Sequence, residues 1–194
     1  MFDTDALRDR LMASAEVKRL TADACSDAAM AAARMITAKL QTGGKLMLCG
    51  NGGSAGDSQH LAAEFVATLD HRRPRKGLAA LALTTDTSFL TAYANDFGFE
   101  GVFSRQVETL GLAGDVLMAI STSGNSANVV AACITAREQG IKVIAMTGAG
   151  GGTLADHADI LLAVPSDVTM HIQESHIALG HVITLAVERL LEAS

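Results

Sequence analysis

A strand, a glycine-rich turn and the start of a helix follow one another in the stretch Lys45-Leu-Met-Leu-Cys-Gly-Asn-Gly-Gly-Ser-Ala-Gly-Asp-Ser-Gln-His-Leu-Ala-Ala-Glu-Phe65. The apolar run Lys45–Cys49 is typical of a buried strand. The glycines after it allow a sharp turn and a close approach of a ligand to the backbone. A helix is predicted from about Ser54 onward, and it carries His60 and Glu64 one turn apart. This arrangement predicts a small-molecule site where the strand ends.

Short apolar runs alternate with helical patterns from this stretch onward. The predicted strands are Lys45–Cys49, Leu78–Leu83, Val116–Ser121, Lys142–Thr147 and Ile160–Val164. They are almost continuously apolar, as strands covered by helices on both faces are. The predicted helices are Ser54–Leu69, Thr87–Asn95, Phe99–Leu110, Ser126–Gln139, Thr153–His157 and Val168–Leu191. The alternation predicts an α/β fold, a three-layer αβα sandwich around a five-stranded parallel sheet with right-handed crossovers.

The segment before the first strand is predicted to be helical. Residues 4–41 are rich in good helix formers and contain no Pro or Gly, and Gly43-Gly44 follows them. Thr21 or Asp23 is a candidate cap for a second helix within the segment. Because such helices have little to bury on their own, we expect them to pack on the core or on partner subunits. The chain is therefore predicted to be one domain, residues 1–194, with an N-terminal helical segment over residues 1–42.

Composition narrows the class of protein. Hydrophobic residues make up 49% of the 194 residues but aromatic residues only 4%, so alanine and aliphatic side chains must fill the core. No apolar run reaches the roughly 18 residues that favour a membrane span, and the N-terminus lacks a signal-peptide apolar region. The formal net charge of −6 argues against a general nucleic-acid binder. The three cysteines form no CxxC pair, which favours a reduced, cytoplasmic setting.

Two predicted strands run into unusually polar turns, and ligands of open parallel sheets bind at such carboxyl ends. One turn is Gly50-Asn-Gly-Gly-Ser54, which lacks the dinucleotide-binding glycine pattern. The other, Ser121-Thr-Ser-Gly-Asn-Ser126, has four hydroxyls in six residues just before a helix. A helix N-terminus with hydroxyls suits a phosphate monoester, although a hydroxyl turn with an ordinary helix cap is the alternative. There is no Walker lysine pattern, so a nucleotide P-loop is not predicted.

Several polar side chains are candidates for chemistry. The spacing of His60 and Glu64 suits a metal or an acid–base pair, or else an ordinary surface pair. In the last predicted helix Gln173 and His181 are eight residues apart, about 80° around the helix. Spacing alone leaves three alternative site residues open in that helix: His171, Glu174 and His176.

Two further polar segments have open interpretations. Asn95-Asp96 is either a helix cap or a ligand for sugar hydroxyls. The basic cluster His71-Arg-Arg-Pro-Arg-Lys76 is either a solvated loop or a contact to an anion or a neighbouring subunit.

Taken together, these residues resemble the sugar isomerase (SIS) domain proteins, and within them the branch that isomerises sedoheptulose 7-phosphate. The resemblance runs in order over almost the whole chain through Gly50-Asn-Gly-Gly-Ser54, Gln59-His60, Glu64-Phe65, Leu83-Thr-Thr-Asp86, Asn95-Asp96, Ser121-Thr-Ser-Gly124 and Ile172-Gln-Glu174. It implies a flavodoxin-like sheet and conversion of D-sedoheptulose 7-phosphate to D-glycero-D-manno-heptose 7-phosphate. That reaction is the first step towards the heptoses of lipopolysaccharide and other surface glycans. The resemblance also implies cytoplasmic homotetramers with intersubunit sites and one zinc ion per subunit.

The resemblance further implies roles for individual residues. The implied metal ligands are His60, Glu64, Gln173 and His181. The implied catalytic residues are Glu64 as base and His181 as its acid–base partner. The implied substrate contacts are Asn51, Gly52, Gly53, Glu64, Asn95, Asp96, Ser121, Thr122, Ser123, Ser126 and Gln173.

One position departs from the pattern. Four residues after the glutamate that matches Glu64, the family has an arginine that helps to bind substrate, whereas this chain has Thr68. We expect Arg72, Arg73 or a neighbouring chain to supply that contact. The alternative functions are a non-catalytic SIS protein that binds a replication initiator or another protein partner, a sugar-phosphate-sensing regulator, and an isomerase of a different sugar phosphate such as arabinose 5-phosphate.

Overall fold

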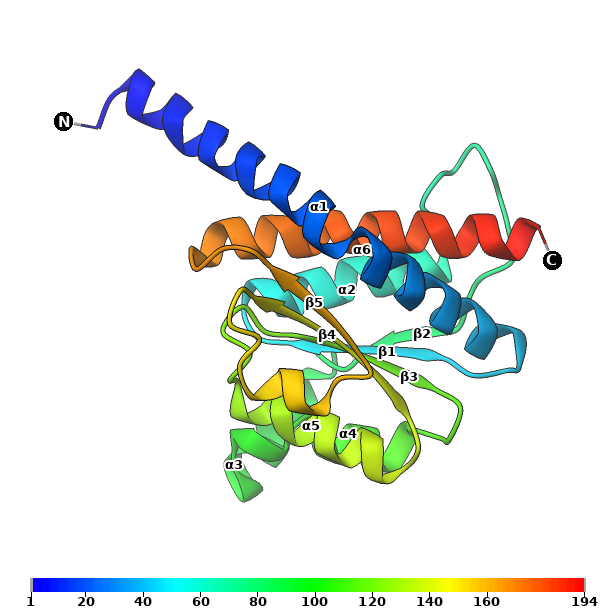
Figure 1. Ribbon diagram of the computed structural model, residues 1–194. Helices are drawn as coiled ribbons and strands as arrows, with labels where there is room; N and C mark the ends of the chain where they lie inside the picture. The colour runs from blue at the N-terminus through cyan, green and yellow to red at the C-terminus, as the bar shows by residue number, and fades with distance from the viewer. Residues whose placement is uncertain (1, 194) are drawn as a thin grey trace.

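A five-stranded, all-parallel sheet forms the centre of the molecule in a computed structural model that describes residues 2–193 (Figure 1). The strands are β1 (Leu46–Gly50), β2 (Ala80–Ala82), β3 (Val116–Ile120), β4 (Lys142–Gly148) and β5 (Ile160–Val164). All five predicted strands are confirmed, each with its ends within about two residues of the predicted ones. The spatial order is β2-β1-β3-β4-β5. In this order the winding reverses between β1 and β3, and doubly wound sheets bind ligands beyond the carboxyl ends at such a point.

Helices cover both faces of the sheet, which confirms the three-layer αβα sandwich. The helices are α1 (Thr4–Gln41), α2 (Gly53–Val66), α3 (Thr87–Phe97), α4 (Ser104–Leu110), α5 (Ala127–Glu138) and α6 (Thr169–Glu192), with 3₁₀ turns η1 (Phe99–Gly101) and η2 (Thr153–His157). On one face lie α1, α2 and α6, and on the other α3, α4 and α5. Within residues 2–193 no helix is both long and apolar enough to cross a bilayer.

Alternation along each strand supplies both halves of the core. On β1, Leu46 and Leu48 pack towards α1, α2 and α6, while Met47 and Cys49 pack towards the opposite layer. All residues of β1 and β3 are buried. Because helices cover both faces, the strands show a continuous apolar run rather than an apolar–polar alternation. This is the physical reason that they could be found in the sequence.

The N-terminal segment is one continuous helix of 38 residues, so the expectation of more than one helix there was wrong. Asp3 caps it, since its side chain accepts a hydrogen bond from the Ala6 amide at 3.0 Å. Thr21, a candidate cap of a second helix, is buried and donates to the Val17 carbonyl inside the same helix. Asp23, the other candidate, pairs with Arg19 one turn earlier. The second half of α1 packs on β5 and α6, whereas its first half projects beyond the sheet (Figure 1).

The predicted helix Phe99–Leu110 is also corrected, because the structure divides it into η1 and α4. The break falls at Val102 and Phe103, whose exposed fractions are 0% and 2%. The chain turns inward at these two residues and buries them in the core layer of α4 and α5. Tertiary packing therefore overrides a local helical preference, which amounts to a few tenths of a kcal/mol per residue.

Candidate active site

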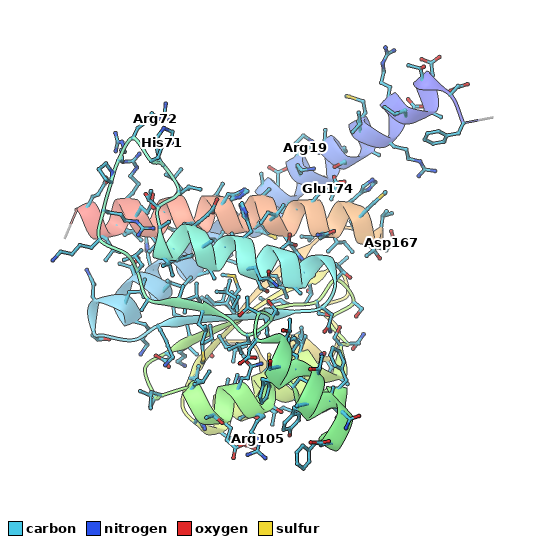
Figure 2. All side chains as sticks on the ribbon, turned by 180° about the vertical axis from the view of Figure 1, so that it is seen from behind. Arg19, His71, Arg72, Arg105, Asp167 and Glu174 are labelled. Atoms are coloured by element: carbon cyan, nitrogen blue, oxygen red, sulfur yellow. The ribbon has the colours of Figure 1, made fainter. Side chains whose placement is uncertain are left out.

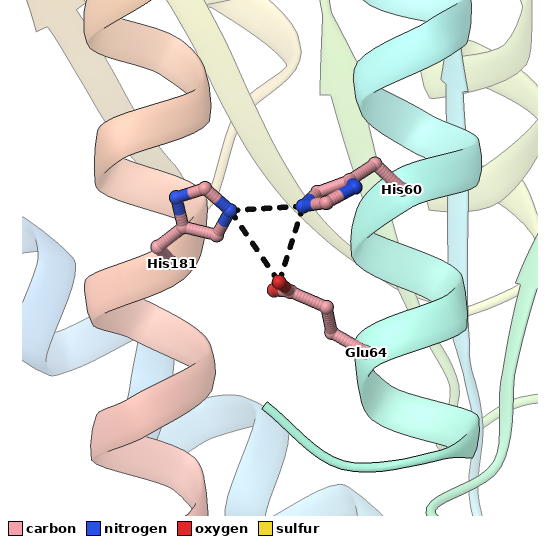
Figure 3. Close-up of side chains that lie close together, drawn as sticks. All are labelled: His60, Glu64 and His181. Carbon is pink, nitrogen blue, oxygen red and sulfur yellow. Dashed lines mark hydrogen bonds and ion pairs between the residues drawn. The ribbon is translucent and has the colours of Figure 1, made fainter. Parts of the chain in front are cut away.

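Three side chains from α2 and α6 converge on one point: His60 and Glu64 from α2, and His181 from α6 (Figure 3). The Nε2 atoms of His60 and His181 are 3.0 Å apart. Oε1 of Glu64 lies 3.1 Å from Nε2 of His60 and 3.4 Å from Nε2 of His181. The two rings meet nearly edge to face, at 77°. We call these three residues the His–Glu triad.

The His–Glu triad fits a metal ion. Two imidazole nitrogens and a carboxylate oxygen are ligands that zinc takes, and tetrahedral bonds of about 2.0–2.1 Å place neighbouring ligand atoms about 3.3 Å apart. The three observed separations, 3.0, 3.1 and 3.4 Å, lie close to that value. The second carboxylate oxygen, Oε2 of Glu64, is buried and has no hydrogen-bond partner. The carboxylate therefore has acceptor capacity that contacts within the chain do not use.

Gln173, the fourth predicted ligand, lies against the start of α2. Its Nε2 is 3.4 and 3.5 Å from the two carboxylate oxygens of Asp57. It also covers Gly53, where an added Cβ would lie 2.5 Å from that same nitrogen. The amide is thus held beside the first turn of α2, and glycine at position 53 leaves the space for it.

Asp57 is a site residue that sequence reasoning missed. It has an exposed fraction of 8% and precedes His60 by one turn and Glu64 by two, so all three lie on one face of α2. Burial raises the pKa of its carboxyl group, while the Gln173 amide and the charges of His60 and His181 act in the opposite direction. The spacing of positions 57, 60 and 64 was the signal available in the sequence.

The two polar turns meet at the switch point of the sheet. Gly50 and Ile120 are register partners on β1 and β3, so the turns that follow them begin side by side. The Asn51 amide donates to Asn128 on α5 at 2.8 Å, and the buried Asn128 amide donates back to Asn51 at 2.9 Å. This reciprocal pair links the first turn to the helix that follows the second. Gly52, with φ +54°, stands at the start of α2.

Hydroxyls gather in the turn before α5. Oγ of Ser121 lies 2.9 Å from Oγ of Ser126 and 3.3 Å from Oγ of Ser123. Ser126 is the N-cap residue of α5, yet its side chain makes no capping hydrogen bond. Gly124 has φ +67°, and an added Cβ would lie 2.0 Å from the Gly151 carbonyl, so both the backbone conformation and the lack of space require glycine there. Ser123 Oγ accepts from the Asn125 amide at 3.1 Å, as in the hydroxyl turn of the alternative interpretation, but the amides at the start of α5 lack its side-chain cap.

A pocket of 280 Å³ opens beside this turn, at the carboxyl ends of β3, β4 and β5. Its lining includes Thr122, Ser123, Gly148, Asp167 and Ile172. Asp167 stands at the N-terminal end of α6, which Figure 2 shows from the back of the molecule. The pocket therefore joins two of the predicted substrate-binding residues to the loop that leads into the helix of His181.

Asn95 and Asp96 lie apart from the His–Glu triad. They are exposed in the last turn of α3, in the layer opposite α2 and α6 (Figure 1). The Asn95 amide donates to the Asp96 carboxylate at 2.8 Å. Within one subunit the structure does not bring these two residues into contact with the triad or the polar turns.

The other candidate site residues in α6, which are His171, Glu174 and His176, lie away from the His–Glu triad or have other partners. Glu174 accepts hydrogen bonds from Ser14 and Lys18 of α1. His176 is fully buried, and its Nε2 lies 3.0 Å from the Thr147 carbonyl. His171 is also buried and is not part of the group of converging ligand atoms. Of the histidine and glutamate side chains considered in α6, His181 is the one whose ligand atom lies beside those of His60 and Glu64.

The basic cluster is largely a solvated loop between α2 and β2. His71 and Arg72 lie at its tip (Figure 2). Arg72 pairs with Asp70 at 2.9 Å, and Arg73 pairs with Glu192 at 3.6 Å. Neither arginine approaches the His–Glu triad within the chain. Only Arg75 of this cluster turns inward.

The sequence model of the SIS domain matches residues 13–148, which is more than half of the chain. The parallel sheet, the hydroxyl-rich turn at the switch point and the matched segment agree with one another. The chain therefore belongs to the SIS domain family.

Within that family, the chain is similar to proteins named phosphoheptose isomerase. It is 54% identical over 183 residues to the one from Roseiflexus sp. (strain RS-1), covering 94% of this chain and 92% of that relative. The solved structure of phosphoheptose isomerase GmhA from Neisseria gonorrhoeae matches with a TM-score of 0.90 at 44% identity, covering 95% of this chain and 98% of that one. A phosphoheptose isomerase from Francisella tularensis matches with a TM-score of 0.92 at 36% identity, covering 97% and 100%.

Proposed function

We propose that the protein is a phosphoheptose isomerase, which converts D-sedoheptulose 7-phosphate into D-glycero-D-manno-heptose 7-phosphate. The observation that carries this proposal is the convergence of His60, Glu64 and His181 in a chain 54% identical to a protein of that name. The product would enter the synthesis of heptose precursors for lipopolysaccharide or other surface glycans.

Glu64 and His181 are the residues we assign to proton transfer. Aldose–ketose isomerisation moves a proton between two adjacent carbons through an enediol, and it needs a base near carbon and an acid–base group near oxygen. Glu64 removes the proton from C1 of the ketose and returns it to C2. His181 exchanges the proton between the two sugar oxygens, and we propose that its own contact with the metal, like that of Glu64, gives way to substrate when it does so. Oε2 of Glu64 has no hydrogen-bond partner, which supports a carboxylate that keeps one oxygen for this task.

A single zinc ion per subunit is the proposed cofactor, held by His60, Glu64, Gln173 and His181. When bound, it supplies positive charge that polarises the sugar carbonyl and stabilises the negative oxygen. Gln173 would bind through Oε1 after its amide leaves Asp57. Because a carboxylate that gives both oxygens to a metal is a poor base, we propose that Glu64 binds through one oxygen or is displaced by substrate.

The remaining predicted residues are assigned to the substrate. The phosphate is placed at the N-terminus of α5, where amides and hydroxyls favour an anion. The proposed phosphate contacts are Ser121, Thr122, Ser123 and Ser126. The proposed sugar contacts are Asn51, Gly52, Gly53, Glu64, Asn95, Asp96 and Gln173.

We further propose a cytoplasmic homotetramer of single SIS domains, each spanning residues 1–194, with sites completed by neighbouring subunits. In support, the projecting half of α1 exposes Leu7, Leu11 and Met12. An apolar groove of 370 Å³ also runs between α1 and α6. The three cysteines are buried free thiols, which agrees with a reducing compartment.

A coupled isomerase assay on sedoheptulose 7-phosphate, with metal analysis, tests the function. Wild type is expected to turn the substrate over and Glu64→Gln to lose nearly all activity. Glu174→Gln is the matched control, because Glu174 faces α1 and not the site. A folded, metal-loaded wild type without turnover would favour the non-catalytic binding protein. Turnover of arabinose 5-phosphate instead would assign another substrate.

A further inference from the structure

Arg75 closes the C-terminal end of α2. Its Nη2 donates to the main-chain carbonyl of Glu64 at 2.9 Å, and its Nη1 donates to that of Phe65 at 2.9 Å. The last carbonyls of a helix have no partner within the helix, so a guanidinium placed there satisfies them. One of the two carbonyls belongs to the residue that we assign as the catalytic base.

The other side of the same guanidinium is bound to α6. Nε of Arg75 donates to Oε1 of Glu188 at 2.7 Å. Both side chains are largely buried, with exposed fractions of 16% for Arg75 and 7% for Glu188. The Glu188 carboxylate also accepts from the Leu69 amide at 3.1 Å. One carboxylate on α6 therefore holds both Arg75 and the chain that leaves α2.

This pair spans the same two helices as the His–Glu triad. Glu188 follows His181 by seven residues, which places both on one face of α6 two turns apart. We propose that Arg75 and Glu188 form a positioning clamp, which sets the placement of α2 against α6 and hence of His60 and Glu64 against His181. The role in catalysis rests on the proposed function, whereas the role in metal binding does not require turnover.

Thr68, where the chain departs from the family's arginine, also lies beside this pair. Oγ1 of Thr68 lies 3.4 Å from Oε1 of Glu188, so position 68 faces the same carboxylate. The arginine that binds Glu188 is Arg75, further along the same loop. Arg72 and Arg73, expected to compensate, form exposed pairs on the outside of the loop.

Arginine and lysine should act differently in the clamp. The forked guanidinium can hold a carboxylate and two carbonyls at once, whereas an ammonium is a point charge on a flexible stem. Arg75→Lys therefore keeps a charge opposite the buried Glu188 but loses the fixed geometry. Arg75→Met leaves Glu188 buried without its partner, which is strongly destabilising in general.

The experiment compares zinc affinity, kcat and KM in wild type, Arg75→Lys, Glu188→Gln and Arg72→Met. Zinc affinity is measured by competition with a chromophoric chelator, and folding by circular dichroism. We expect Arg75→Lys to fold and to lose about 10- to 100-fold in zinc affinity and kcat, as changes around metal ligands do, with little change in KM. Glu188→Gln keeps an acceptor for Arg75 and Leu69, so its zinc affinity and kcat should fall by less than those of Arg75→Lys. Arg72→Met, which breaks an exposed pair in the same loop, should match wild type.

Wild-type zinc affinity and kcat in a folded Arg75→Lys would overturn the clamp and leave a merely structural ion pair. Equal losses in Arg72→Met would also overturn it, because the effect would then be one of loop charge. If Arg75→Lys does not fold, Glu188→Gln decides by the same measurements. A wild type that binds zinc without isomerase turnover would overturn the proposed function alone, since the zinc affinities would still test the clamp.

Discussion

His60 and His181 bring their Nε2 atoms to 3.0 Å from each other, although 121 positions separate them in the sequence. One ring stands on α2 and the other on α6, and these helices pack on the same face of the sheet. The geometry of the His–Glu triad therefore depends on the packing of two helices rather than on a local motif. Changes that alter this packing should act on metal binding before they act on the fold.

Zinc should stabilise the wild-type protein against heat. A ligand at 100 times its dissociation constant that binds only the folded state adds about 2.7 kcal/mol to the free energy of unfolding. His181→Ala should lose most of this increment because it removes one of three converging ligand atoms. Thermal melts with and without zinc measure it, and His71→Ala, at the tip of an exposed loop, is the control. An equal zinc-dependent shift in His181→Ala would contradict the proposed site.

Two glycines of the same helix should respond in opposite ways to alanine. Gly53→Ala places a Cβ 2.5 Å from the Gln173 amide, whereas at Gly56 nothing lies within 4 Å of the new atom. We expect Gly53→Ala to weaken zinc affinity by about tenfold or more, as displaced groups around a metal do. Gly56→Ala should keep zinc affinity and stabilise the helix by about 0.5–1 kcal/mol. Chelator competition and chemical denaturation measure the two effects, and an unchanged affinity in Gly53→Ala would remove Gln173 from the site.

Ser126→Ala should affect substrate binding more than stability. Ser126 makes no capping hydrogen bond, so its loss should cost less than the ~1 kcal/mol typical of a helix cap. The loss of its hydroxyl should raise KM for the phosphorylated sugar. Asp3→Ala removes a side-chain cap at the start of α1, so it should lower stability and leave KM unchanged. A Ser126→Ala variant with wild-type KM and reduced stability would return this turn to a structural role.

Stability should fall as the pH is lowered from about 6.5 to about 4, and His176 should be one cause. Burial lowers the pKa of His176 from 6.5 to about 4, against the opposing effect of its contact with the Thr147 carbonyl. In this range the unfolded chain binds a proton that the folded chain does not, so acid favours unfolding. The full shift corresponds to about 3 kcal/mol, since one pKa unit is about 1.4 kcal/mol. Denaturation of wild type and His176→Gln over this range should show a shallower decline in the variant, and parallel curves would contradict the assignment.

The layers of the fold were predictable because burial on both faces leaves a clear mark in the sequence. Continuous apolar runs located all five strands, and the polar turns located the switch point. The break between η1 and α4 was not predictable, because it exists to bury Val102 and Phe103 against distant residues. The continuity of α1 was not predictable for a related reason. Thr21 could cap a second helix or lie buried within one helix, and the local sequence does not distinguish the two.

The candidate site was predictable only where it is local. The spacing of His60 and Glu64 predicts that both lie on one face of α2, and the spacing of Asp57 predicts the same face for that residue. In α6 the spacing left several residues open, because it does not tell which side of a helix faces its neighbour. The role of Arg75 could not be predicted from its loop sequence, because it depends on contact with Glu188, which lies in α6 near the C-terminus.

The packing of α1 has a consequence for the order in which the molecule can assemble during synthesis. This helix is synthesised before the other elements of the fold, but its second half packs on β5 and α6, which come after all the others in the order of the elements. Until those arrive, buried residues such as Ala32 and Ile36 have no permanent neighbours. Such long-range contacts slow folding and leave apolar surface open meanwhile, so the nascent chain is expected to depend on chaperones until α6 has emerged.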